Sequence, residues 1–137
     1  MATDLWINLP VKNVDRAKEF FGRIGFAVDE RRNGSEMACL SIGEKQLNVL
    51  LFPEEIFKRF SGGDVADSRS GAEVLLSVGA ASREAVDETA RKVWDAGGRV
   101  FSEPQEKEGW MYGCGFADLD GHRWNVVYMD FAKMPQG

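Results

Sequence analysis

The residues best suited to chemistry lie in FADLDGHRWNVVYMD, residues 116–130, which places the single histidine of the chain close to an asparagine in an apolar run. His122 follows an Asp-Gly turn signal, and Asn125 comes three residues later. Successive side chains of a strand point to opposite faces, so positions 122 and 125 would face opposite ways if both were extended. We therefore expect His122 to be a turn residue that bonds local backbone, with Asn125 on the opposite side of the strand.

Composition excludes several classes of protein and of site. The net charge is −5, and the pair Arg31 and Arg32 is isolated, which argues against a nucleic-acid surface. Cys39 and Cys114 lie far apart without CxxC spacing, which favours reduced thiols over a disulfide or a metal site. No stretch reaches the ~18 apolar residues of a membrane span, and the start lacks the pattern of a signal peptide. We predict a soluble, cytoplasmic protein without nucleic-acid or membrane partners.

The elements that must position these residues recur in the same order in two halves. A strand is followed by a helix with an Asn, Asp or Ser cap, by a glycine stop and by three further strands. The acidic stretch SEPQEKEG is expected to be a solvated loop, and residues 53–71 a short helical turn plus a linker. The predicted strands span residues 5–11, 26–30, 37–42 and 46–52 in the first half, and 72–78, 99–101, 112–117 and 123–129 in the second.

The repeated order predicts a duplicated βαβββ module in one α+β domain, residues 1–137, with module one at about 4–52 and module two at about 72–130. KQLNVLLF and HRWNVVYM carry an Asn-Val pair at the same place, which supports the duplication. One helix covers one face of each four-stranded sheet. Two such modules placed edge to edge would leave a curved half-barrel trough, where small ligands bind.

Strand alternation divides the side chains into an apolar set, which should pack on the helices, and a mixed set facing the trough. Polar residues at inward positions are costly unless they form hydrogen bonds, so the mixed set favours a ligand site. Alternatively, the asparagines bond one another across the pseudo-twofold axis. The trough-facing set is Trp6, Asn8, Asn48, Leu50, Glu73, Asn125 and Val127.

The order of elements, INLPVKNVDRAKEFF, the helix ending AGG and FADLDGHRWNV together resemble the vicinal oxygen chelate superfamily, the glyoxalase I, bleomycin-resistance and extradiol dioxygenase group. The ending MYGCGFADLDGHRWNVVYMD resembles its predicted lactoylglutathione lyases. The resemblance covers nearly the whole chain. It implies the glyoxalase/bleomycin-resistance-like fold, a homodimer, and, in metal-dependent members, His and Glu ligands on the first and fourth strands of each module.

Carried over to this chain, those ligand positions fall on Trp6, on Asn48 or Leu50, on Glu73 and on Asn125. Only Glu73 is a good ligand, because the tryptophan N–H donates and asparagine binds Zn²⁺ or Ni²⁺ poorly. The resemblance therefore implies a degenerate metal site and no cofactor, with a divalent metal held through Glu73 as a disfavoured alternative.

Three possibilities stay open at this point, and the third is a small structural or regulatory dimer without a ligand. The first is a protein that binds a small molecule in the trough. The second is a lyase or isomerase of the glyoxalase I type, with Glu73 as catalytic base in an apolar setting that raises its pKa. Glycines 113 and 115 are expected to permit close approach or a bulge. The predicted substrate-binding residues are Trp6, Asn8, Asn48, Leu50, Trp110, Tyr112 and Asn125, with the aromatic pair as a rim over the trough.

Overall fold

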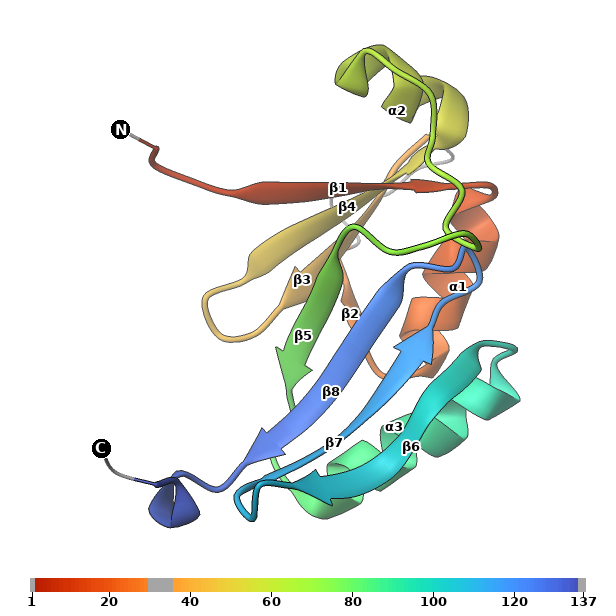
Figure 1. Ribbon diagram of the computed structural model, residues 1–137. Helices are drawn as coiled ribbons and strands as arrows, with labels where there is room; N and C mark the ends of the chain where they lie inside the picture. The colour runs from red at the N-terminus through yellow and green to blue at the C-terminus, as the bar shows by residue number, and fades with distance from the viewer. Residues whose placement is uncertain (1, 30–35, 136–137) are drawn as a thin grey trace. The chain divides into compact units, whose positions relative to one another are not determined.

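The computed structural model describes residues 2–29 and 36–135 (Figure 1). The chain divides into two compact units, Met1–Gly71 and Ala72–Gly137. Each unit contains one four-stranded mixed sheet with a helix packed on it, in the order βαβββ. The predicted α+β architecture of two βαβββ modules is confirmed.

Module one is a sheet with the strand order β1-β4-β3-β2. Its edge strand β1 runs parallel to β4, whereas β3 is antiparallel to both of its neighbours. This order brings the first and last strands of the module side by side in its sheet. The elements are β1 (Trp6–Val11), α1 (Val14–Arg23), β2 (Ala27–Val28), β3 (Ala38–Ile42), β4 (Leu47–Pro53) and α2 (Glu54–Ser61).

Local sequence signals set the limits of α1. The Asn13 side chain accepts a hydrogen bond from the backbone N–H of Arg16 at 3.0 Å, and Gly25 adopts a φ of 99° beyond the last turn. Both features match the predicted start and stop. The helix packs on β3 and β4. It buries one apolar face, composed of Val14, Ala17, Phe20 and Phe21.

Module two repeats the arrangement with the strand order β5-β8-β7-β6, and β5 runs parallel to β8. Ser82 caps α3 by accepting a hydrogen bond from the N–H of Ala85 at 3.1 Å, as predicted. At the centre of this core the rings of Phe116 and Trp124 stack with an interplanar angle of 3°. The elements are β5 (Leu75–Gly79), α3 (Arg83–Asp95), β6 (Arg99–Lys107), β7 (Met111–Ala117), β8 (Arg123–Met129) and a short 3-10 helix (Phe131–Lys133).

Two predicted limits in module two are wrong. The strand expected from residue 72 begins at Leu75, so Glu73 precedes it. Most of the acidic stretch expected as a loop, residues 102–107, is instead the second part of β6, and only Glu108 and Gly109 lie in a turn. Strand β6 lies at the sheet edge and its register shifts twice, between Val100 and Ser102 and between Ser102 and Gln105. An irregular edge strand tolerates charges and a proline such as Pro104, which is why composition predicted a loop.

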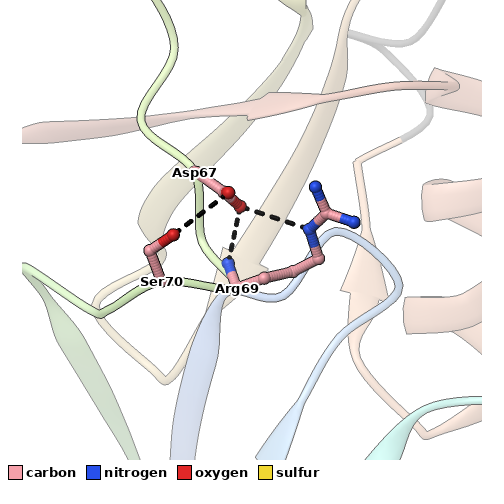
Figure 2. Close-up of polar contacts among 3 residues, drawn as sticks. All are labelled: Asp67, Arg69 and Ser70. Carbon is pink, nitrogen blue, oxygen red and sulfur yellow. Dashed lines mark hydrogen bonds and ion pairs between the residues drawn. The ribbon is translucent and has the colours of Figure 1, made fainter.

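The segment between α2 and β5 is shaped by a local turn around Asp67, shown in Figure 2. One carboxylate oxygen accepts from the backbone N–H of Arg69 at 3.0 Å and from its Nε at 3.3 Å, and the other accepts from the Ser70 hydroxyl at 3.1 Å. These bonds, first of all that of the backbone N–H, lower the pKa of Asp67. All three residues are exposed, so the turn organises the linker.

Three predicted features lie outside the described residues. They are the end of the strand predicted at 26–30, the loop RNGSE up to residue 35 and the Arg31–Arg32 pair. Within the described ranges, no helix is long and apolar enough to cross a membrane.

Candidate functional site

In each module, the sheet face turned away from α1 or α3 carries the candidate residues that lie within β1, β4 and β8; we call it the distal face of that module. In module one, Trp6 pairs with Asn48, and Asn8 pairs with Leu50. Paired residues of adjacent strands share a face, so these four side chains lie together, as strand alternation predicted. Four residues of opposite parity are buried, namely Leu9, Val11, Val49 and Leu51, whereas Leu47 at the start of β4 is exposed.

The two polar partners on this face differ in their surroundings. Trp6 is 51% exposed, so its indole ring is available to a ligand. Asn48 is half-buried, and its Oδ1 accepts a hydrogen bond from the thiol of Cys39 at 3.6 Å. On the same face, the ring of Phe60 from α2 packs edge-on against Phe52 at a centroid distance of 5.3 Å. Asn48 is thus partly satisfied inside its own sheet.

In module two, Asn125 lies between Ser77 of β5 and Gly115 of β7 on the distal face. It is half-buried, and within residues 2–29 and 36–135 its side-chain amide makes no hydrogen bond. The next pair along the same face is Gly79 with Val127. Asn125 therefore offers a donor and an acceptor on a face where its neighbours in adjacent strands are small.

Beside Asn125, three residues of different strands form one stack. The Phe101 ring lies on Gly115, because a Cβ built at 115 would be only 2.5 Å from Phe101 Cε1. The guanidinium carbon of Arg123 lies 4.7 Å from the centroid of the same ring. Sequence reasoning missed Arg123, although its place two residues before Asn125 on β8 gives it the same face.

Glu73, the predicted catalytic base, is exposed and precedes β5. Trp6 pairs with Asn48 in module one, whereas the partner of Asn125 in module two is Ser77. When the two asparagines are taken as equivalent, Ser77 therefore corresponds to Trp6, and Glu73 lies four residues too early. The structure does not bring Glu73 into the row of Asn125, and its catalytic role stays a prediction.

Tyr112, a predicted rim residue, lies on the helix side of module two. Its hydroxyl donates to Asp87 Oδ1 of α3 at 2.5 Å, and this bond raises the pKa of Tyr112. Arg83 lies over the tyrosine ring at 4.9 Å and donates to Glu106, whose pKa this bond lowers. The structure therefore separates Tyr112 from Asn125. Trp110 is half-buried in the preceding turn, where its carbonyl accepts from the N–H of Asp130 at 2.8 Å.

The turn before β8 is built around Asp118, a buried carboxylate that sequence reasoning missed. Its oxygens accept from the N–H groups of Asp120 and His122, each at 3.0 Å, and from Trp124 Nε1 at 3.1 Å. Burial raises the pKa of Asp118, against the opposing effect of His122 and these hydrogen bonds. The backbone of His122 bonds Asp118 in both directions, which confirms the predicted local turn role.

The residues at the superfamily's metal positions do not fit a divalent metal. The Trp6 N–H can only donate, and Asn48 already accepts from a thiol. In the described part of the chain, no three His, Cys, Asp or Glu side chains come together as a metal site. We therefore derive no chemical step through a metal.

Comparison with known proteins adds to this geometry. A family model described as bleomycin resistance protein-like N-terminal matches residues 3–43. A hypothetical protein from S. aureus is 33% identical, with a TM-score of 0.83, and the match covers 93% of this chain and 95% of that one. A glyoxalase-related enzyme from Fulvimarina pelagi is 17% identical, with a TM-score of 0.80 and coverage of 100% and 94%. No curated protein matches the chain.

A further solved structure, a glyoxalase/bleomycin resistance protein/dioxygenase family enzyme from Burkholderia phytofirmans, is 17% identical, with a TM-score of 0.77 and coverage of 93% and 99%. Identities this low show the shared fold, whereas the S. aureus relative and the matched family model show relationship in sequence. With its two βαβββ modules, the chain belongs to the vicinal oxygen chelate superfamily, the glyoxalase, bleomycin-resistance and dioxygenase group.

Proposed function

We propose that the distal sheet faces bind a small organic molecule, and that they do so without the divalent metal of the metal-dependent superfamily members. The observation that carries this proposal is Asn125. It is a half-buried amide that has no hydrogen-bond partner in the described chain and that lies between Ser77 and Gly115. Polar groups removed from water generally have partners, so such an amide favours a ligand.

The distal face of module one supports the same proposal in a different way. Trp6 offers a large, half-exposed aromatic surface on the same face as Asn8. Aromatic rings with a polar edge supply much of the contact area in small-molecule sites. The opposite face of the sheet is apolar, and its Leu9, Val11, Val49 and Leu51 are buried, so polar and aromatic side chains are confined to the distal face.

A small-molecule library screened by ligand-observed NMR tests this proposal, with one variant for each face. Trp6→Ala and Asn125→Ala are the two variants, and Trp94→Ala is the matched control. Trp94 lies on α3 and is 54% exposed, against 51% for Trp6. We expect the Kd of each hit to rise about tenfold or more, ~1.4 kcal/mol, in one of the two face variants and to be unchanged in the control. A library without hits, or hits that ignore both substitutions, would contradict the proposal.

The resemblance also implies a homodimer, which we include in the proposal. Sedimentation equilibrium of the full chain should then give twice the chain mass of 15.3 kDa. A mass of one chain at all concentrations would remove the dimer from the proposal and leave the binding faces to be tested separately.

A further inference from the structure

We infer that the ligand of module two carries a carboxylate or a similar oxyanion, and that Arg123 receives it. This inference rests on the proposed function, because it assigns the chemical class of the molecule bound at the distal face of module two. It starts from the position of Arg123 on β8, two residues before Asn125 and on the same face. Two residues of a strand span about 7 Å, so one small molecule can contact both side chains.

Arg123 is held in place by an aromatic ring, while its charge is left uncompensated. No carboxylate in the described ranges pairs with its guanidinium, whose central carbon lies 4.7 Å from the centroid of the Phe101 ring. By contrast, Arg83 and Arg91 each bind a glutamate, Glu106 and Glu88. In a chain with a net charge of −5, an arginine without an acidic partner on a sheet face is a cation available to a ligand.

The position of Phe101 follows from two features of the sheet. The register of β6 shifts between Val100 and Ser102, so Phe101 is the extra residue of an irregular strand, and such irregularities re-aim side chains. Gly115 then leaves the space into which the ring fits. A guanidinium near an aromatic ring is attracted by the face of that ring and loses rotational freedom. Arg123 is therefore ordered before the ligand arrives, which reduces the entropy lost on binding.

The chemistry of these groups defines the ligand class. A guanidinium binds a carboxylate through two parallel N–H bonds, which gives direction as well as charge. The Asn125 amide can add one donor and one acceptor about 7 Å away along the strand. Val127, next on this face and flanked by Gly79 and Gly113, offers an apolar surface with little on either side. The fitting molecule is small and partly apolar, with an anionic group at one end.

Matched pairs of probes test the inference, namely benzoate with benzamide and nicotinate with nicotinamide. We expect the carboxylates to bind the wild-type chain at millimolar concentration and about tenfold or more tightly than their amides. Arg123→Gln should raise the Kd of the carboxylates about tenfold and leave that of the amides unchanged. Arg91→Gln, on the exposed side of α3, should change neither. Phe101→Leu keeps the charge of Arg123 and removes the aromatic ring, so it should lower carboxylate affinity by less than Arg123→Gln does. It replaces Arg123→Gln as the test if that variant folds poorly.

The failures of the two proposals can be told apart. Amides that bind as tightly as their carboxylates, or carboxylates indifferent to both Arg123→Gln and Phe101→Leu, would overturn the anionic ligand. The binding function would stand in that case if hits still depended on Asn125. Carboxylates that fail to bind even at tens of millimolar would overturn the inference, and a library without any hit would overturn the binding function as well.

Discussion

The ring of Phe101 occupies the space that the missing side chain of Gly115 leaves on the distal face of module two. A Cβ at position 115 would lie 2.5 Å from Cε1 and 2.6 Å from Cζ of that ring. The same ring lies beneath the guanidinium of Arg123. One residue without a side chain thus sets where an aromatic ring lies, and through that ring it sets the position of a cation.

Gly115→Ala should therefore move the Phe101 ring. The ring is the far end of a flexible side chain, so we expect a modest loss of about 1 kcal/mol in the free energy of unfolding, at the low end of overpacking effects. Urea denaturation measures this loss. We also expect weaker carboxylate binding in this variant, because Arg123 loses its ordered position.

Two other glycines provide the comparison for Gly115→Ala. At Gly113 a Cβ would meet the backbone carbonyl oxygen of Val126 at 2.8 Å, and a backbone atom cannot rotate away. Gly113→Ala should therefore be the more destabilising of the two substitutions. At Gly22 in α1 nothing lies within 4 Å, so Gly22→Ala should stabilise by about 0.5–1 kcal/mol. Equal effects at 113 and 115 would contradict this account of the distal face.

Asp118→Asn should destabilise the chain by about 1–3 kcal/mol, because the carboxylate serves three donors with two oxygens. An amide replaces one acceptor oxygen with an N–H₂ group, which would face either a backbone N–H or the indole N–H of Trp124. Thermal or urea unfolding measures the change. Asp64→Asn is the control, because Asp64 is exposed and should stay within about 0.5 kcal/mol of wild type. Similar stabilities of the two variants would remove Asp118 as the centre of the turn.

Local signals in the sequence predicted most of the fold. The caps of α1 and α3 depend on residues within one turn of the helix, and strand alternation in residues 6–11 and 46–52 depends only on neighbours. Such features can be read without knowing what packs against them. The shared face of Trp6 and Asn48 was also predicted, because both strands were given the correct parity, whereas their direct pairing was not.

The errors arose where distant residues decide the structure. The second half of β6 looked like a loop because charges and Pro104 are common in loops, yet pairing with β7 makes it a strand. Glu73 was predicted to lie in a strand, at the position equivalent to Trp6. The pairing of Ser77 with Asn125 shows that Ser77 holds that position instead. Tyr112 was expected among the ligand-binding residues, but Asp87 of α3 binds its hydroxyl on the other side of the sheet. Arg123 acquires its ordered position from Phe101, whose place depends on a register shift in β6.

Tyr112→Phe should lower stability and leave ligand binding unchanged. It removes the hydroxyl that donates to Asp87, at an expected loss of about 0.5–1.5 kcal/mol in the free energy of unfolding. Tyr128 is the matched control, since it pairs with Tyr112 across β7 and β8 but its hydroxyl makes no hydrogen bond with the described residues. Tyr128→Phe should therefore change stability less. If Tyr112→Phe binds any ligand more weakly than wild type while Tyr128→Phe does not, Tyr112 belongs to the binding site after all.

The buried thiol of Cys114 should make the fold less stable at high pH. Burial raises its pKa from 9.0 to about 11, because the thiolate would be desolvated beneath α3. The unfolded chain then loses this proton near pH 9 while the folded chain keeps it to about pH 11. Stability from this group is thus fully present below pH 9 and is lost as the pH rises through that window, by about 1–2 kcal/mol.

Urea unfolding of wild type and Cys114→Ala on both sides of the window measures the effect, since all other groups cancel in the difference. Wild type should lose more stability than the variant, and parallel pH profiles would show that the thiol titrates alike in both states.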